Sequence, residues 1–292
     1  MRRILLLLLA VFAVGSPAAA QGAFRSDRII VETRGRGPDV ILIPGLGSTA
    51  TAWGPAVNRL DDQYRLHLIT VRGFGDTAIA GNAEGGIEGP VANEIRRYMA
   101  EQRLNRPALI GHSMGGQIAL RVAADAREGV SRVMVVDSAP FFPALVDARA
   151  TSAQIEPIAQ VIYQALMLFG DSALSAQIGG FGGDLGAAGD MVFGGLGLQG
   201  GDRRILAQGL YEVMTVDLRL RLREITAPVT VAYGWSRDEN NPRSKLEALF
   251  RSGFDNLRTP ARFEPIEGAE HQVMSDQPQR FLAAVQRFLG GV

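Results

Sequence analysis

The sequence has 292 residues, with 30 basic and 30 acidic side chains and no cysteine. The balanced charge leaves no basic surplus for nucleic acid or a membrane surface, and the lack of cysteine excludes disulfides and a lipid-anchored cysteine. No His/Cys cluster has the spacing of a metal site, so we expect no metal. We expect no cofactor either, because the candidate residues identified below can act without one.

The first segment, 1–20, is typical of an export signal. Two arginines precede the apolar run 4–14, and Ala18-Ala19-Ala20 offers small residues for cleavage. This run is shorter than the roughly 20 apolar residues that span a bilayer, and no later run is longer. We therefore expect export to the periplasm or the extracellular space, no membrane span, and a mature chain that begins near Gln21.

Short runs rich in Val, Ile and Leu alternate with segments of helical period. Strands are expected at 28–33, 40–44, 65–71, 108–111, 132–137, 229–233 and 261–266. Several are apolar throughout, which is typical of strands buried on both faces of a parallel sheet. Amphipathic helices are expected at 114–126 and 277–289. This alternation predicts an α/β fold, with a mostly parallel sheet and helices on both faces.

A glycine-containing turn, Pro44-Gly45-Leu46-Gly47-Ser48, follows the second expected strand. Glycines let the backbone approach a ligand closely, and the Leu46 N–H is a candidate donor to an oxyanion. An ordinary glycine turn is the alternative interpretation.

Ser113 lies in Gly111-His112-Ser113-Met114-Gly115, between an expected strand and an expected helix. This Gly-x-Ser-x-Gly pattern is typical of a sharp turn that presents a serine oxygen to a substrate. The N–H of Met114, at the start of the helix, is the second candidate oxyanion donor. The alternative is that Ser113 only caps the helix.

The regular alternation stops between residues 141 and 214, which we interpret as an inserted cap over one end of the sheet. Its first part, 155–169, has a helical pattern, and a glycine-rich stretch follows. Apolar side chains within that stretch favour a cover over a solvated linker. The two parts of the core are then expected at 21–140 and 215–292.

The chain has three histidines. His67 lies within an expected strand, and His112 adjoins Ser113 in a bend where neighbouring side chains diverge. His271 lies in a loop before the last helix, where it is free to reach the serine. A histidine titrates near neutral pH and suits general base catalysis, so we predict His271 as the base.

Four motifs resemble, in their order along the chain, those of the α/β-hydrolase fold family. They are Pro44-Gly45-Leu46-Gly47, Arg72-Gly73-Phe74-Gly75-Asp76, Gly111-His112-Ser113-Met114-Gly115 and Glu270-His271. The resemblance covers most of the chain after the signal, apart from the insertion. It implies a nucleophilic serine after a central strand, a cap inserted one strand later, and a histidine before the last helix.

The resemblance also implies a triad, in which an acidic residue joins the serine and the histidine. The sequence marks this acid less clearly than the other two residues. The family usually places an acid in a Gly-x-x-Asp pattern after the strand that follows the cap. Here Gly234 is followed by Trp235-Ser236-Arg237-Asp238, so Asp238 lies one residue further along. We predict Asp238 as the acid, with Asp137 as the alternative and Glu239 as a further one. The acid holds the histidine in the correct tautomer.

The function expected from these residues is a serine hydrolase that cleaves a small-molecule carboxylic ester through an acyl-enzyme on Ser113. Phe141, Phe142, Phe193 and Met214 lie in or beside the insertion and are candidates for an apolar substrate pocket. Lactones, amides and carbon–carbon bonds are alternative substrates of the same triad. A cofactor-free peroxidase and a non-catalytic binding protein of the same fold are further alternatives.

Overall fold

The computed structural model describes residues 24–169, 200–236 and 243–290. In these ranges a seven-stranded sheet has the order β1-β3-β2-β4-β5-β6-β7. The strands are β1 (Ile29–Arg34), β2 (Asp39–Ile43), β3 (Arg65–Val71), β4 (Ala108–His112), β5 (Arg132–Val136), β6 (Val229–Trp235) and β7 (Arg262–Glu267). Only β1 is antiparallel to its neighbour among these pairs. The expected mostly parallel sheet is therefore confirmed.

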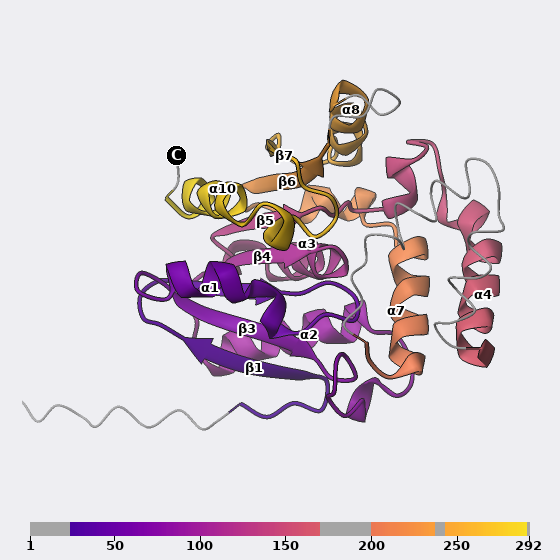
Figure 1. Ribbon diagram of the computed structural model, residues 1–292, viewed down its shortest axis with the longest axis horizontal. Coiled ribbons are helices and arrows are strands. Elements are labelled where there is room, and N and C mark those ends of the chain that lie inside the picture. The colour runs from indigo at the N-terminus through magenta and orange to yellow at the C-terminus, as the bar shows by residue number, and fades with distance from the viewer. Residues whose placement is uncertain (1–23, 170–199, 237–242, 291–292) are drawn as a thin grey trace, which may run out of the picture.

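Helices cover both faces of the sheet (Figure 1). One face carries α1 (Gly54–Leu60), α9 (Val273–Asp276) and α10 (Pro278–Gly290), and the other carries α2 (Glu88–Glu101), α3 (Met114–Ala126) and α8 (Arg243–Gly253). Alternate residues of a strand point to opposite faces. Accordingly, Val40 and Leu42 of β2 pack in one apolar cluster, and Ile41 and Ile43 pack in the other.

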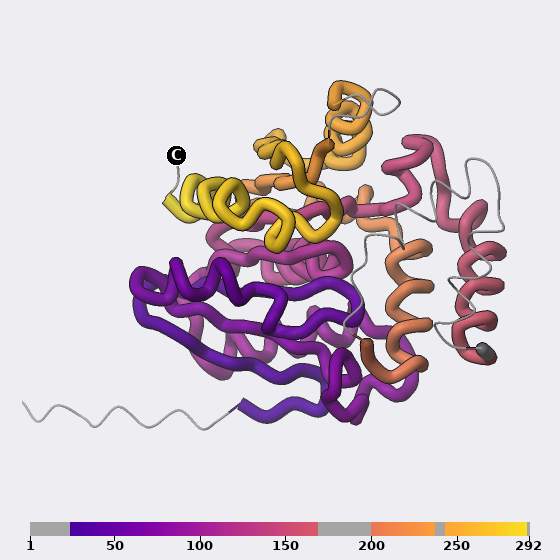
Figure 2. The backbone as a smooth tube through the Cα atoms, viewed as in Figure 1, coloured from indigo at the N-terminus to yellow at the C-terminus, as the bar shows by residue number. Residues whose placement is uncertain are grey.

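The end of the chain lies beside its early part on one face of the sheet. Figure 2 shows α10 next to α1, and the rings of Trp53 and Phe281 are 6.2 Å apart. At the centre, β2 is flanked by β3 and β4, so the chain order reverses there. Such a reversal creates a crevice at the carboxyl ends of the strands, where α/β folds bind their ligands.

The segment between β5 and β6 contains α4 (Ser152–Phe169) and α7 (Arg203–Thr215), which pack on each other beside the sheet (Figure 1). The helix expected at 155–169 is present and begins at Ser152. Helix α7 is not among the expected helices, and Gly209 in its middle lowers its helix propensity. Burial of Ile205, Leu210 and Val213 stabilises it instead. The glycine-rich stretch 170–199 and the signal 1–20 lie outside the described residues, and the limits of the cap stay a prediction.

A buried carboxylate on α7 joins the insertion to the core. Glu212 accepts hydrogen bonds from the backbone N–H groups of Ile87 and Glu88, at 2.7 and 2.8 Å, at the start of α2. These N–H groups have no partner within their own helix. The Glu88 side chain is fully buried, its oxygens have no hydrogen-bond partner among the described residues, and Arg121 is 3.7 Å away. Burial, followed by the charge of Glu212, raises the pKa of Glu88 to about 8.

This raised pKa predicts a pH-dependent stability. Between about 4.5 and about 8 the folded state keeps the Glu88 proton while the unfolded state releases it, so stability falls as pH rises through this window. The slope is at most about 1.4 kcal/mol per pH unit. In urea unfolding, Glu88→Gln is expected to lose this dependence and to gain stability over the parent from pH 5 to pH 8. The exposed Glu101→Gln is the control, and parallel pH curves for parent and Glu88→Gln would contradict the prediction.

Candidate active site

Ser113 lies in a sharp turn between β4 and α3, with φ +52° and ψ −124°. A positive φ is rare for a residue with a side chain and marks a backbone held under strain. The serine side chain makes no capping hydrogen bond to α3, and its buried Oγ has no partner among the described residues. The helix-cap interpretation is therefore excluded in this conformation.

The glycines around Ser113 are required by close backbone contacts. A methyl group at Gly111 would overlap the carbonyl oxygen of Gly115, and one at Gly115 would overlap the carbonyl oxygen of Ile43. Because these neighbours are backbone atoms, they cannot move aside as a flexible side chain could. The Gly-x-Ser-x-Gly pattern is thus a steric condition for packing the turn against β2.

His271 lies in the loop between β7 and α9, and its Nδ1 is 2.6 Å from Oδ2 of Asp137. The other carboxylate oxygen of Asp137 accepts the backbone N–H of Gly234 at 3.0 Å. This contact to the carboxylate favours the tautomer with hydrogen on Nδ1, which leaves the lone pair on Nε2. Nε2 of His271 is buried and has no hydrogen-bond partner among the described residues.

The structure thus brings Asp137, the alternative acid, to the histidine. Asp137 directly follows β5 and has a positive φ of 45°. Asp238 and Glu239 lie outside the described residues. β5 and β6 are neighbours in the sheet, so the ends of both strands reach the same edge.

The residue before the serine contacts the histidine loop. Nε2 of His112 is 2.8 Å from the backbone carbonyl oxygen of His271, and the two rings are 4.7 Å apart. The loop of His271 is therefore joined to the turn that carries Ser113. No direct hydrogen bond joins Ser113 to His271 in this conformation; such bonds are often long in the absence of a substrate.

The two candidate oxyanion residues also lie beside the serine turn. A methyl group at Gly45 would be 3.1 Å from Cβ of Ser113, so the loop that carries Leu46 packs directly on the turn. In α3 the backbone hydrogen bonds to Ser113 begin with the N–H of Gly116, at 2.8 Å. The N–H of Met114 comes earlier, among the helix donors that lack an intrahelical partner.

Helix α7 packs on the side chains of both candidate oxyanion residues. A methyl group at Gly209 would lie 2.6 Å from Cδ1 of Leu46 and 3.3 Å from Sδ of Met114. The insertion therefore packs closely against Leu46 and Met114 because Gly209 has no side chain. Sequence patterns gave no signal for Gly209 or Glu212, because each acts through contacts with distant segments.

A model described as the alpha/beta hydrolase family matches residues 40–284 of the chain, a range that includes Ser113, Asp137 and His271. The chain belongs to the alpha/beta hydrolase family. The resemblance seen in the motifs and the expected α/β-hydrolase fold are both confirmed.

Similar proteins of the alpha/beta hydrolase family include esterases. The pimeloyl-(acyl-carrier protein) methyl ester esterase of Aeromonas hydrophila is 26% identical over 282 residues, which cover 90% of this chain and 99% of that protein. The enzyme of the same name from Aliivibrio salmonicida is 29% identical over 204 residues, which cover 70% of this chain and 76% of that protein. An esterase structure from Exiguobacterium antarcticum has a TM-score of 0.67 at 20% identity and covers 90% of this chain and 95% of its own. That last likeness concerns the fold.

The four residues predicted to line a substrate pocket differ in their burial and in their neighbours. Phe142 is buried in the apolar cluster that also contains Leu46, and Met214 is half-buried against that cluster. Phe141 is buried, with the Arg219 guanidinium 4.8 Å from its ring centre. Phe193 lies outside the described residues. Their role as a substrate pocket stays a prediction.

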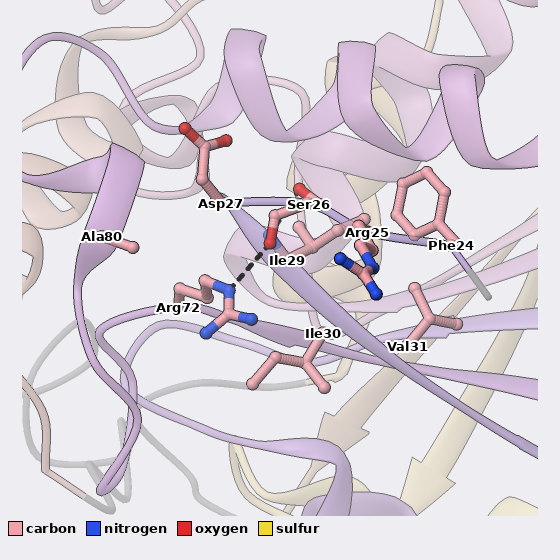
Figure 3. Close-up of a pocket in the computed structure, with 9 residues that line it drawn as sticks. All are labelled: Phe24, Arg25, Ser26, Asp27, Ile29, Ile30, Val31, Arg72 and Ala80. Carbon is pink, nitrogen blue, oxygen red and sulfur yellow. Dashed lines mark hydrogen bonds between the residues drawn. The ribbon is translucent and has the colours of Figure 1, made fainter.

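A separate groove of about 590 Å³ lies along the edge strand β1 (Figure 3). Residues 24–27, 29–31, Arg72 and Ala80 line it, and Arg72 donates to the carbonyl oxygen of Ser26 at 3.0 Å. Neither Ser113 nor His271 lines this groove, so it is separate from the candidate active site.

Within the described ranges, no cluster of three or more His, Cys, Asp or Glu side chains could hold a metal ion. The same part of the chain contains no helix that is long and apolar enough to cross a membrane.

Proposed function

We propose that this alpha/beta hydrolase is an exported serine esterase that cleaves carboxylic esters with a hydrophobic acyl or alcohol part. The observation that carries the proposal is the arrangement of Asp137, His271 and Ser113. A carboxylate fixes the histidine through Nδ1, and a strained turn presents a serine oxygen without a competing hydrogen bond. The named esterase activity of the two curated relatives supports an ester as the substrate.

In the proposed mechanism, Nε2 of His271 takes the Ser113 proton while Oγ attacks the carbonyl carbon of the ester. The N–H groups of Leu46 and Met114 stabilise the negative charge that develops on the carbonyl oxygen. The protonated His271, stabilised by Asp137, then donates its proton to the leaving alcohol. Water, activated by the same histidine, releases the acid and restores the serine.

Apolar packing around the site supports the preference for a hydrophobic ester. Phe142 belongs to the same apolar cluster as Leu46, a candidate oxyanion residue, and Met214 packs against that cluster. An acyl chain that enters beside the loop of Leu46 would exchange contacts with water for apolar contacts. Each buried methylene contributes about 0.8 kcal/mol, so kcat/KM is expected to rise with acyl length.

The test is a panel of p-nitrophenyl acetate, butyrate and octanoate, run beside a lactone and a p-nitroanilide. We expect the longer esters to be the best substrates, and a fluorophosphonate probe to modify the peptide that contains Ser113, as read by mass spectrometry. Faster turnover of the lactone or the anilide would replace the ester proposal. If no substrate is turned over and Ser113 is not labelled, the result would favour a binding protein.

Export is a separate part of the proposal. When the full chain is produced in a bacterium with a periplasm, we expect the protein in the periplasmic or extracellular fraction, with a first residue near Gln21. Deletion of residues 2–20 should keep it in the cytoplasm. A full-length, uncleaved chain in the cytoplasm would contradict the proposal.

A further inference from the structure

His112 is a buried histidine that the mechanism above does not use. It is the last residue of β4, directly before Ser113, and its side chain is 1% exposed. Burial, and then the charge of the neighbouring His271, lower the pKa of His112 to about 3. The ring is therefore neutral at any pH at which His271 could serve as a base.

The contacts of His112 determine its tautomer. Nε2 is 2.8 Å from the backbone carbonyl oxygen of His271. A carbonyl oxygen can only accept, so the hydrogen of the neutral ring is on Nε2. Nδ1 then carries a buried lone pair, which has no hydrogen-bond partner among the described residues.

The ring of His112 lies between segments that must be aligned for catalysis. A methyl group at Gly45 would be 2.9 Å from Nδ1 of His112, so the ring packs against the loop of Leu46. On another side its ring is 4.7 Å from that of His271. One side chain thus contacts the oxyanion loop and the base loop, and is covalently adjacent to the nucleophile.

A role in packing alone does not explain the choice of histidine. An apolar ring such as phenylalanine would fill similar space without a buried nitrogen that lacks a donor, and such a nitrogen lowers stability. What phenylalanine lacks is the N–H that reaches the His271 carbonyl. Positions that break a packing rule in this way are expected at functional sites.

Asp137 holds the ring of His271 through Nδ1, and the remaining anchors of this loop hold its flanks. The N–H of Gly268 donates to the backbone carbonyl oxygen of Trp235 at 2.7 Å, and the N–H of Glu270 donates to Oδ2 of Asp276 at 2.9 Å. The bond from His112 is made to the backbone of the base itself. It therefore restrains the main chain that carries the imidazole.

We propose that His112 is a positioning residue, whose Nε2–H holds the main chain of His271 so that the imidazole faces Ser113 Oγ. The proposal rests on the proposed serine hydrolase function. His112 does not touch the substrate or transfer a proton, and it acts through the geometry of His271. A misplacement of about 1 Å in such a site can lower the rate by about 100-fold.

The experiment compares His112→Phe, which removes the donor, with His112→Gln, whose amide can place an N–H near the position of Nε2. With p-nitrophenyl butyrate, we expect His112→Phe to lower kcat by about 10- to 100-fold with a KM within about threefold of the parent. The rate of fluorophosphonate labelling of Ser113 should fall in parallel. His112→Gln should restore most of the loss.

Two further readouts separate positioning from a general loss of structure. The downfield proton resonance of the Asp137–His271 hydrogen bond should broaden in His112→Phe and return in His112→Gln. His67 provides the matched control, since it is also a buried histidine but bonds to Asp39 and Tyr98 away from the site. His67→Gln should leave kcat unchanged.

A kcat for His112→Phe within twofold of the parent would overturn the proposal. So would equal losses in the Phe and Gln variants, because these would show that the donor is irrelevant. Failure of the proposed function itself gives a different result, in which Ser113→Ala keeps its turnover or Ser113 is not labelled. Loss of activity in Ser113→Ala with full activity in His112→Phe would reject the positioning role alone.

Discussion

Replacing Ser113 with alanine is expected to lower kcat/KM for p-nitrophenyl butyrate by about 10⁴- to 10⁶-fold, the range found when a serine triad loses its nucleophile. The reason is that alanine has no oxygen to form the acyl-enzyme, so Nε2 of His271 has no proton to accept. The backbone amides near Leu46 and Met114 are unaffected, so a small residual rate above that in water should persist. Initial rates over a range of substrate concentrations measure the effect.

The matched control for this variant is Ser252→Ala. Ser252 lies on α8, where its exposed side chain donates to the Leu249 carbonyl oxygen at 3.0 Å. This change should leave kcat/KM within about twofold, as is usual for surface substitutions. Thermal unfolding should show that both variants are folded. If Ser113→Ala keeps a tenth or more of the activity, the acyl-enzyme mechanism is wrong.

Much of the fold could be predicted from the sequence, because its strands are marked by local composition. β2, β4 and β5 are short apolar runs, since both faces of each strand are covered by helices. The turn at Ser113 was also predictable. Its two glycines are imposed by backbone contacts that any sequence must satisfy to build this turn.

Features that depend on contacts between distant segments could not be predicted in the same way. Helix α7 is a clear case, because Gly209 weakens its helical signal while the same glycine lets it pack on Leu46 and Met114. Glu212 likewise has no motif, since its partners are backbone groups at the start of α2. His112 is a third case, because the sequence shows only that it adjoins Ser113, whereas its hydrogen bond is to the distant His271.

The acid illustrates why spacing along the chain is an incomplete guide. The Gly-x-x-Asp pattern of the family favoured Asp238, although one extra residue separates it from Gly234. Asp137 has no such pattern, but β5 and β6 are adjacent, and the positive φ of Asp137 accompanies a 2.6 Å contact with His271. We therefore propose Asp137 as the acid of the triad.

Replacing Asp137 with asparagine is accordingly expected to lower kcat by about 10³- to 10⁴-fold, as in serine hydrolases that lose this carboxylate. The amide oxygen can still accept the N–H of Gly234, so the fold should be retained. The amide nitrogen, placed toward His271, donates to Nδ1 and moves the ring hydrogen to Nε2. The base then has no lone pair for the Ser113 proton.

The control for this prediction is Asp238→Asn, which changes the other candidate by the same chemistry. If Asp137 alone holds His271, Asp238→Asn should keep kcat within about threefold, and the double variant should be no slower than Asp137→Asn. The opposite ranking would assign the acid to Asp238 and make the Asp137 contact structural. A large loss in both single variants, with the double variant equal to either, would mean that both carboxylates act on His271 as one unit, because the effects of residues that act together are not additive.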